Sequence, residues 1–202
     1  MSYDIRTYKK RMRSRTDLSS YLTHLTRGND DNNARNILLK ILKNREIKGS
    51  NNNGFICGKN NAVCFQDAPI HSLCQNSYHE QIYTPELGGK RRYSPIGLCF
   101  KKAYVYNKGG RPVIYERTDI AKKFIKEEEW WRIVSFDLSN EDSMIDWTHE
   151  REWRCKGDFC FELADVIVLL TNHKTYKKFI EIADEDIVKN IGGIIVLDPI
   201  LT

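Results

Sequence analysis

The sequence predicts a mixed α+β domain in which strands outnumber helices. Polar and apolar residues alternate early in the chain, a helical spacing follows, and several short apolar runs come after residue 95, separated by Gly-rich or charged connections. The 202 residues are 41% hydrophobic and 11% aromatic, which is enough apolar material for one buried core. We therefore expect a basic arm over residues 1–18 and a single domain over residues 19–202.

The net charge of +5 is concentrated on the arm. Residues 1–16 hold six Lys or Arg and one acid, and the other 26 bases and 26 acids balance. Ile5, Tyr8 and Met12 follow at i, i+3 and i+7, which predicts a basic amphipathic helix. Two interpretations stay open: a surface offered to RNA, DNA or an acidic protein, or a solvated terminal helix.

Residues 19–27 form the first predicted strand, because alternation places His24 and Thr26 on the same face. The polar loop "GNDDNN" that follows can supply the N-cap of a helix. From Ala34 the apolar residues keep helical spacing, which predicts a helix that ends near Lys48-Gly49.

A short buried strand is predicted over residues 62–65, and residues 66–94 hold few periodic apolar positions. That second stretch predicts a long irregular excursion containing a short helix. Apolar runs and spacing predict the remaining elements, which are strands over residues 95–102, 111–116, 131–137, 164–170 and 193–198 and helices over residues 119–130 and around Tyr176, Phe179 and Ile180.

Missing motifs exclude several kinds of site. GxGxxG, GxxxxGK[ST] and GxSxG are absent, which argues against a Rossmann dinucleotide site, a P-loop and a serine hydrolase elbow. The six cysteines form no CxxC pair and the five histidines no HExxH motif, so we expect no metal. One minor alternative stays open, because Glu46 and Lys48 have the ExK spacing of metal-dependent nucleases.

Membrane insertion and export are not expected. No apolar run approaches the roughly 18 residues of a membrane span. The N-terminal segment is charged where a signal peptide needs an apolar core. We therefore expect a cytoplasmic protein without a membrane partner.

The segment "DWTHEREWR", residues 146–154, gathers aromatic, basic and acidic side chains in one place. Composition alone favours an exposed strand with cross-strand ion pairs. The other interpretation is that Glu150 and Glu152 are held in place for chemistry.

The order of several motifs supports the second interpretation. His-x-Thr on an early strand, a helix, a short strand leading into a loop, and a late Glu-x-Glu resemble the ADP-ribosyltransferase fold. More narrowly, "LTHLTR", "ARNILLKILKNREI", "VCFQDAP", "YSPIGLCFKK" and "EREWR" are similar to motifs of DarT-like toxins and of related abortive-infection, phage-defence families. This resemblance covers roughly residues 20 to 200 and implies a mainly antiparallel, split β-sheet with flanking helices.

The resemblance also implies a function. It is that of an NAD-dependent mono-ADP-ribosyltransferase toxin of a toxin–antitoxin or anti-phage system, with NAD as co-substrate, no metal, and an antitoxin protein as partner. The acceptor would be nucleic acid, with RNA slightly preferred over DNA, because the basic arm and the aromatic residues could hold an unpaired strand. The alternative is a catalytically inert nucleic-acid-binding or antitoxin-type module with the same fold.

The catalytic residues implied by the resemblance are the two glutamates. Glu152 matches the catalytic glutamate of the family, whose carboxylate stabilises the positive charge that develops on ribose as nicotinamide leaves. Glu150 lies two residues earlier, on the same side of an extended chain, and is expected to orient or deprotonate the accepting group.

The resemblance implies an NAD site as well. His24 would hydrogen-bond the nicotinamide-side ribose, with Thr26 assisting from the same face, and Asn36 would bind ribose or pyrophosphate. Two further roles each have two candidates, which are Phe65 or Tyr93 for stacking on nicotinamide and Arg27 or Arg154 for pairing with the pyrophosphate.

Overall fold

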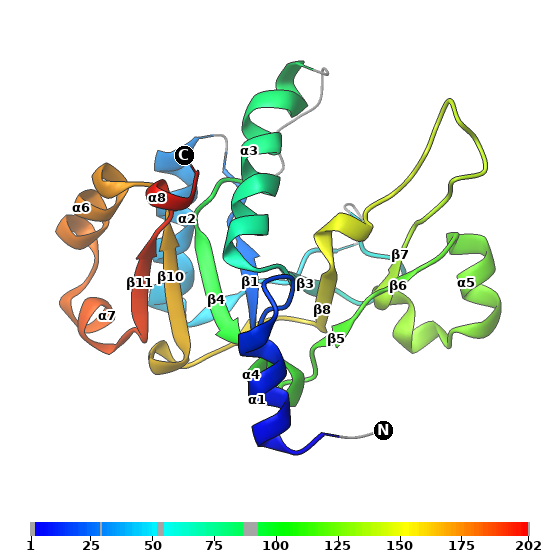
Figure 1. Cartoon of the computed structure of the whole chain (residues 1–202), viewed down its shortest axis with the longest axis horizontal. Helices are drawn as coiled ribbons and strands as arrows, with labels where there is room; N and C mark the ends of the chain where they lie inside the picture. Colours follow the sequence, from blue (N-terminus) through cyan, green and yellow to red (C-terminus); the bar gives the residue numbers. More distant parts are fainter. Residues whose placement is uncertain (1–2, 29, 52–54, 87–92, 202) are drawn as a thin grey trace.

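A seven-stranded sheet organises the chain, and its order is β11-β10-β4-β1-β3-β8-β5 (Figure 1). The computed structural model describes residues 3–28, 30–51, 55–86 and 93–201. β10 and β11 pair in parallel, and the other neighbours pair antiparallel. The predicted α+β class is confirmed. The strands of this sheet are β1 (Tyr21–Leu25), β3 (Ala62–Gln66), β4 (Gly97–Lys101), β5 (Arg111–Pro112), β8 (Glu152–Lys156), β10 (Val166–Leu170) and β11 (Gly193–Val196).

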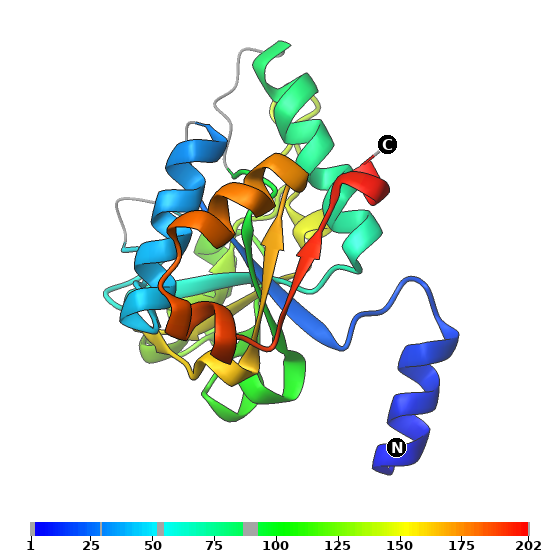
Figure 2. The same ribbon diagram turned by 90° about the vertical axis from the view of Figure 1, so that its left-hand side faces the viewer.

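Helices cover both faces of this sheet. In Figure 2, α2 and α6 lie on one side and α3 and α8 on the other. None of the described helices is both long enough and apolar enough to cross a bilayer. The α-helices are α1 (Ile5–Ser14), α2 (Asp31–Asn44), α3 (Ile70–Glu86), α4 (Lys102–Asn107), α5 (Thr118–Phe124), α6 (His173–Ile182), α7 (Glu185–Asn190) and α8 (Asp198–Leu201).

Shorter elements complete the fold. Two small sheets pair β2 (Glu46–Ile47) with β9 (Phe159–Cys160) and β6 (Ile114–Tyr115) with β7 (Ile133–Val134). The 3-10 turns are η1 (Glu127–Arg132), η2 (Thr148–Glu150) and η3 (Leu163–Asp165).

The predicted helix after the "GNDDNN" loop is confirmed, with shifted ends. The side chain of Asp30 accepts a hydrogen bond from the Asn33 amide at 2.7 Å and caps α2. The helix ends at Asn44 because Arg45 adopts a left-handed conformation with φ of 53°. Glu46 and Ile47, predicted inside the helix, pair with β9 instead.

Residues 66–94 contain the largest error of the sequence prediction. The irregular excursion was expected to contain a short helix, but Ile70–Glu86 form the 17-residue helix α3. Its buried positions include Ser77 and Glu80 besides Leu73 and Cys74. Because half of this buried face is polar, the apolar periodicity that identifies a helix is absent from the sequence.

Two other predicted elements are divided. Residues 111–116 form β5 and β6, which belong to different sheets. Residues 119–130 form most of α5 and part of η1 rather than one helix. In the predicted late helix, α6, Phe179 is buried, whereas Tyr176 and Ile180 are 39% and 37% exposed.

Aromatic rings form the centre of the core on the α2 side of the sheet. Phe65, Phe100 and Phe159 meet edge to face, with ring centroids 5.1 to 6.1 Å apart. Phe161 contacts Phe100 in the same way at 5.1 Å. Edge-to-face pairs add to the free energy gained from burial, so this cluster fixes β3 against β4 and β9.

The sheet opens between β1 and β3. These strands pair at Thr23 and Gln66, whereas β1 pairs with β4 over the whole length of β1. β3 likewise pairs with β8 from Ala62 to Gln66. The two halves of the sheet therefore diverge from one contact, which leaves strand edges free to line a cavity.

Removal of the central ring of the aromatic cluster tests its contribution. Phe100→Ala is expected to lower the free energy of unfolding by about 3–5 kcal/mol. Phe100 is 0% exposed, and its removal leaves a cavity that the surrounding side chains fill only in part. The measurement is urea denaturation followed by circular dichroism. Phe124→Ala, at a 64% exposed position, is the control, and equal losses in the two variants would contradict this role for the cluster.

Candidate functional site

A cavity of about 480 Å³ lies where β1 and β3 diverge. This volume falls in the range of small-molecule sites. Its walls come from the two diverging strands, from β7 and β8, and from the loops beside them. The lining residues are Thr23, His24, Leu25, Arg27, Ser50, Phe55, Ile56, Cys57, Cys64, Phe65, Gln66, Tyr93, Thr118, Ile133, Val134, Ser135, Trp147, Glu150, Glu152 and Arg154.

Both predicted catalytic glutamates line this cavity, but not from one extended segment. Glu150 ends the 3-10 turn η2, Arg151 adopts a left-handed conformation with φ of 44°, and Glu152 begins β8. The side chain of Asp146 accepts a hydrogen bond from the amide of Thr148, the first residue of this turn, at 2.8 Å. The prediction of an extended Glu-x-Glu is therefore wrong, and a turn aims the two carboxylates into the same space.

Glu152 is held by Arg154. The Arg154 Nε donates to Glu152 Oε1 at 2.7 Å and Nη2 donates to Oε2 at 3.3 Å. Both residues of this pair belong to β8, so the pair is not one of the cross-strand ion pairs considered in the sequence analysis. The Glu152 amide also donates to the Tyr115 hydroxyl at 2.8 Å. Because a carboxylate has about four acceptor positions, Glu152 can still accept hydrogen bonds from a ligand.

Arg154 is 1% exposed, and protein groups accept from all of its nitrogens. Besides the contacts with Glu152, Nη1 donates to the Trp131 and Ile133 carbonyls and Nη2 to the Phe55 carbonyl. Burial is the largest single influence and lowers the pKa of Arg154, but the Glu152 carboxylate and Cys64 together raise it, so the pKa lies above its ordinary value. Arg154 thus has no donor left for a pyrophosphate, contrary to its predicted role.

Glu150 accepts hydrogen bonds from two side chains. Gln66 Nε2 donates to Oε2 and the Tyr93 hydroxyl donates to Oε1 at 3.2 Å. Gln66 is 8% exposed, and its Oε1 has no hydrogen-bond partner in the part of the chain that the structure describes. A buried carbonyl oxygen without a partner beside a cavity is suited to an N–H group of a ligand.

Gln66 was not predicted as a site residue. The available signal was a polar residue at the end of an apolar strand, directly before the loop. In the structure it is paired in register with both Thr23 and Glu152. It therefore connects the point where the sheet opens with the strand that carries the catalytic candidate.

His24 lines the cavity and hydrogen-bonds to a backbone carbonyl of the diverging strand β3. Its Nδ1 lies 2.8 Å from the Cys64 carbonyl oxygen. A carbonyl only accepts, so Nδ1 carries the proton. Burial lowers the pKa of His24, although its hydrogen bond to Cys64 acts in the opposite direction. The imidazole is therefore neutral, with Nε2 as an acceptor.

The Cys64 thiol of the cavity is not activated as a nucleophile. All six are free thiols. Burial raises the pKa of the Cys64 thiol, which lines the cavity, above its ordinary value. Since the thiolate is the nucleophilic form, Cys64 is a poor candidate for covalent catalysis.

The other predicted NAD-binding residues divide into two groups. Arg27 is exposed and lines the cavity. Thr26 is 1% exposed and its hydroxyl donates to the Ile96 carbonyl, while Asn36 is exposed on α2, and neither lines the cavity. Phe65 is 1% exposed among other rings, which leaves no open ring face for stacking on nicotinamide. Tyr93 remains the candidate for that role.

The nuclease-like pair lies elsewhere. Glu46 begins β2 rather than ending a helix, and Lys48 pairs with Glu46 at 2.7 Å and with Asp158 at 2.9 Å. Among the described residues, no group of three or more His, Cys, Asp or Glu side chains is arranged to hold a metal ion.

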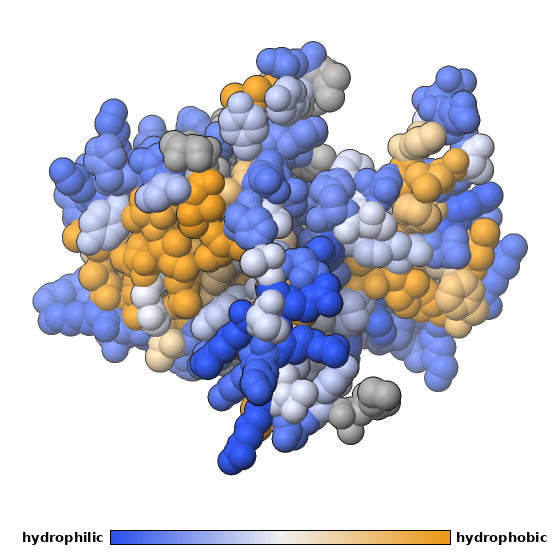
Figure 3. Space-filling view, viewed as in Figure 1, coloured by the Kyte–Doolittle hydropathy of each residue, from blue (hydrophilic) through white to orange (hydrophobic). Residues whose placement is uncertain are grey.

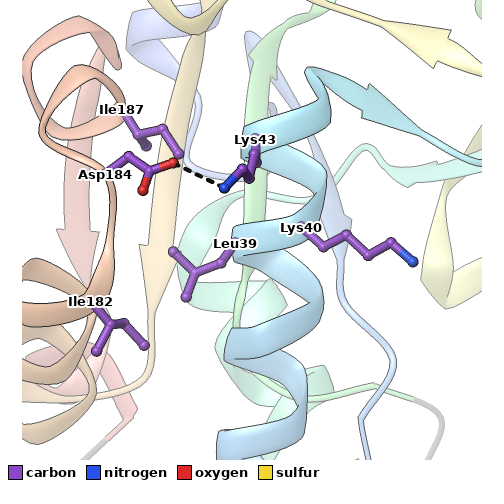
Figure 4. A pocket seen from close by; sticks show the side chains of 6 residues that line it. All are labelled: Leu39, Lys40, Lys43, Ile182, Asp184 and Ile187. Carbon is purple, nitrogen blue, oxygen red and sulfur yellow. Dashed lines mark ion pairs between the residues drawn. The ribbon is translucent and has the colours of Figure 1, made fainter.

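A second hollow, of about 250 Å³, lies between α2 and the α6–α7 segment (Figure 4). Leu39 and Lys40 line it from α2, and an ion pair of 3.6 Å between Lys43 and Asp184 crosses it. It shares no residue with the larger cavity, and its lining of aliphatic side chains, two lysines and Asp184 offers no catalytic arrangement.

Comparison of the chain with protein-family models, with curated proteins and with solved structures gave no significant match.

Removing the guanidinium tests its role as the anchor of the cavity. Arg154→Met is expected to lower the free energy of unfolding by about 3–5 kcal/mol, because it leaves the largely buried Glu152 carboxylate without its counter-charge. The double variant with Glu152→Gln should lose less than the sum of the two single variants. Urea denaturation measures all three. Arg15→Met, in an exposed pair with Asp17, should cost less than about 1 kcal/mol, and a similar small loss at Arg154 would refute the anchor role.

The lowered pKa of His24 gives a pH dependence. Below the ordinary histidine pKa of roughly 6.5 the unfolded chain binds a proton that folded His24 does not, so acidification destabilises the fold by at most about 1.4 kcal/mol per pH unit. His24→Asn, which can still donate to the Cys64 carbonyl, should remove this part of the loss. The measurement is the free energy of unfolding of both proteins at about pH 7.5 and about pH 5.5. If His24→Asn loses as much stability on acidification as the wild type, His24 is not the cause of the pH dependence.

Proposed function

We propose that this chain is an NAD-dependent mono-ADP-ribosyltransferase that acts as a toxin in a toxin–antitoxin or anti-phage system. The observation that carries the proposal is the convergence of His24, Glu150 and Glu152 on one cavity from separate parts of the sequence. The motif order that resembles the ADP-ribosyltransferases names the same three residues. An exposed charged strand would not require this convergence.

The hydrogen-bonding groups that line the cavity suit the nicotinamide-riboside end of NAD. Neutral His24 offers an acceptor for a ribose hydroxyl, and Gln66 Oε1 offers one for a carboxamide N–H. Arg27, exposed where it lines the cavity, offers a guanidinium to the pyrophosphate. Tyr93 supplies the ring for stacking on nicotinamide.

The glutamates have different partners, which supports different roles. Breaking the glycosidic bond leaves positive charge on the ribose, and a carboxylate held in advance beside that charge lowers the barrier. Glu152, fixed by two hydrogen bonds from Arg154, is suited to this role. Glu150, which accepts from Gln66 and Tyr93, is placed to orient or deprotonate the acceptor.

The proposed acceptor is nucleic acid, with RNA preferred over DNA. The basic helix α1 supports this choice, since its positive charge suits a phosphate backbone. An unpaired base can also stack on aromatic side chains, and Phe55 and Trp147 line the cavity with ring centroids 6.4 Å apart. An antitoxin protein that covers the cavity or α1 completes the proposed system.

Transfer from labelled NAD tests the proposal. The purified chain is incubated with labelled NAD and, separately, RNA, single-stranded DNA, duplex DNA and lysate protein. We expect label on RNA and release of nicotinamide, with both reduced at least a hundredfold by Glu152→Gln, about 3 kcal/mol of transition-state stabilisation. Glu150→Gln should reduce transfer more than nicotinamide release.

Two controls make the outcome unambiguous. Glu181→Gln, an exposed glutamate on α6, should leave both reactions unchanged. Because Glu152 neutralises buried Arg154, the thermal midpoint of Glu152→Gln is measured beside its activity, and the activity loss counts only in folded protein. Wild-type protein that neither releases nicotinamide nor labels any acceptor, but binds RNA, would instead support an inert binding module.

A further inference from the structure

Arg151 separates the two candidate catalytic glutamates, and its backbone is held in an unfavourable conformation. Its φ of 44° and ψ of 50° lie in the left-handed region, where the β-carbon crowds the backbone. Two hydrogen bonds stabilise this conformation. The Arg151 amide donates to the Thr148 carbonyl at 3.1 Å, and the Asp67 amide donates to the Arg151 carbonyl at 3.1 Å. The turn that carries Glu150 is therefore joined to the loop after β3.

The Arg151 side chain extends from this turn to the N-terminal arm. Its Nη1 donates to the backbone carbonyl of Asp17, in the linker of residues 15–20 that joins α1 to β1. At the other end of the linker, the Lys102 amide donates to the Ser20 carbonyl at 2.8 Å. Arg151 is exposed, so burial does not require its guanidinium to have this partner. The contact therefore links the position of the turn to that of the arm.

Asp67 brings α1 itself close to the same turn. Its carboxylate pairs with Lys102 at 2.6 Å, and the two side chains are only 21% and 17% exposed. Burial raises the pKa of Tyr8 on α1, and the negative charge of Asp67 raises it further. Tyr8 therefore faces the body of the molecule near Asp67, whose amide binds the Arg151 carbonyl. Asp67 is thus near both α1 and the turn that carries Glu150.

The side of α1 away from Tyr8 is basic. Arg6, Lys10 and Arg13 follow at i, i+4 and i+7, which places them on one face of the helix, and all three are exposed. Figure 3 shows strongly hydrophilic side chains gathered over α1, the helix at the lower centre of Figure 1. A row of positive charges on an exposed helix face suits the phosphate backbone of a nucleic acid.

We propose that Arg151 is a positioning residue that couples nucleic acid on this basic face to the carboxylate of Glu150. The inference rests on the proposed function and names the route of its acceptor. A strand bound to α1 is held by a helix whose linker contacts Arg151, so the strand is led to the Glu150 side of the cavity. Binding also orders the linker, and the Arg151 contact then keeps Glu150 directed into the cavity.

Glu152 does not need this coupling, because Arg154 holds it from within β8. In transfer, the bond between the ribose anomeric carbon and the nicotinamide nitrogen breaks, and nicotinamide keeps the bonding electrons. A nucleic-acid oxygen or nitrogen then bonds to that carbon, and its proton passes to Glu150. In hydrolysis, water replaces this acceptor and needs no guidance from α1. Loss of the Arg151 contact should therefore impair transfer to nucleic acid more than release of nicotinamide into water.

Labelled NAD with single-stranded RNA tests the coupling in the full chain. Arg151→Gly removes the side-chain contact, and glycine adopts the left-handed conformation without strain. We expect this variant to lose about tenfold more of its transfer rate than of its nicotinamide release. Arg151→Lys, which can still donate to the Asp17 carbonyl, should regain most of the transfer. Equal losses of the two activities, or no recovery by lysine, would contradict the positioning role.

Hydrogen exchange tests the coupling without NAD, so its result does not depend on the proposed catalysis. The amides of Glu150 and Arg151 are hydrogen-bonded within the turn, and their exchange reports how well the turn is ordered. Saturating single-stranded RNA should slow this exchange about fivefold in the wild type and leave it unchanged in Arg151→Gly. Such a difference would support the coupling even if the chain did not turn over NAD. The same slowing in both proteins, or none in the wild type, would overturn it.

RNA binding tests the basic face of α1. Arg6→Gln, Lys10→Gln and Arg13→Gln are combined in one variant, since glutamine keeps a high helix propensity. In anisotropy titrations with a fluorescent single-stranded RNA, this variant should bind about tenfold more weakly than the wild type. Its slope of log affinity against log salt should be smaller in magnitude by about 2, because three charges no longer release counterions.

The control removes the same charge from α6, which lies on the α2 side of the sheet (Figure 2). It combines Lys174→Gln, Lys177→Gln and Lys178→Gln, all at exposed positions, and should leave the RNA affinity within about twofold of the wild type. Thermal midpoints establish that every variant is folded. Equal weakening in the two triple variants, or a wild type that does not bind RNA, would overturn the proposal.

Discussion

The buried guanidinium of Arg154 is the constraint on which the cavity depends. Arginine stays charged in proteins, and the cost of burying that charge is offset only if every donor finds an acceptor. Glu152 supplies the counter-charge, and the carbonyls of Phe55, Trp131 and Ile133 supply the remaining acceptors. Strand β8 is thereby tied to the loop at Phe55 and to the segment of η1 and β7, and residues of both line the cavity.

The divergence of β1 and β3 creates the space that Arg154 encloses. Separation of two strands exposes backbone groups that need partners, and His24 provides one for the Cys64 carbonyl. Gln66, at the point where the strands still pair, extends its amide to Glu150. His24 and Gln66 of the candidate site are therefore also groups that stabilise the opening, and both lie on strands.

The sequence predicted elements whose burial repeats at a local period and missed those stabilised by distant contacts. The helix from Ala34 and the strand over 62–65 have apolar periodicity and were found. Helix α3 was predicted only as a short helix within an irregular excursion, because Ser77 and Glu80 occupy its buried face. The left-handed conformation of Arg151, which aims Glu150 into the cavity, has no signal in residue type, since this conformation usually selects Gly or Asn.

Distant contacts also explain why the two candidate arginines have different roles. The sequence alone does not distinguish Arg27 from Arg154, because the guanidinium of either one could pair with a pyrophosphate. Burial separates them: Arg154 is enclosed at 1% exposure, while Arg27 is exposed at the cavity. A guanidinium already bound to a carboxylate would have to break that pair to bind a phosphate, at the cost of leaving Glu152 without its partner. Among the described lining residues, Arg27 is therefore the arginine that remains available to an anionic ligand, and Arg154 contributes by keeping Glu152 in place.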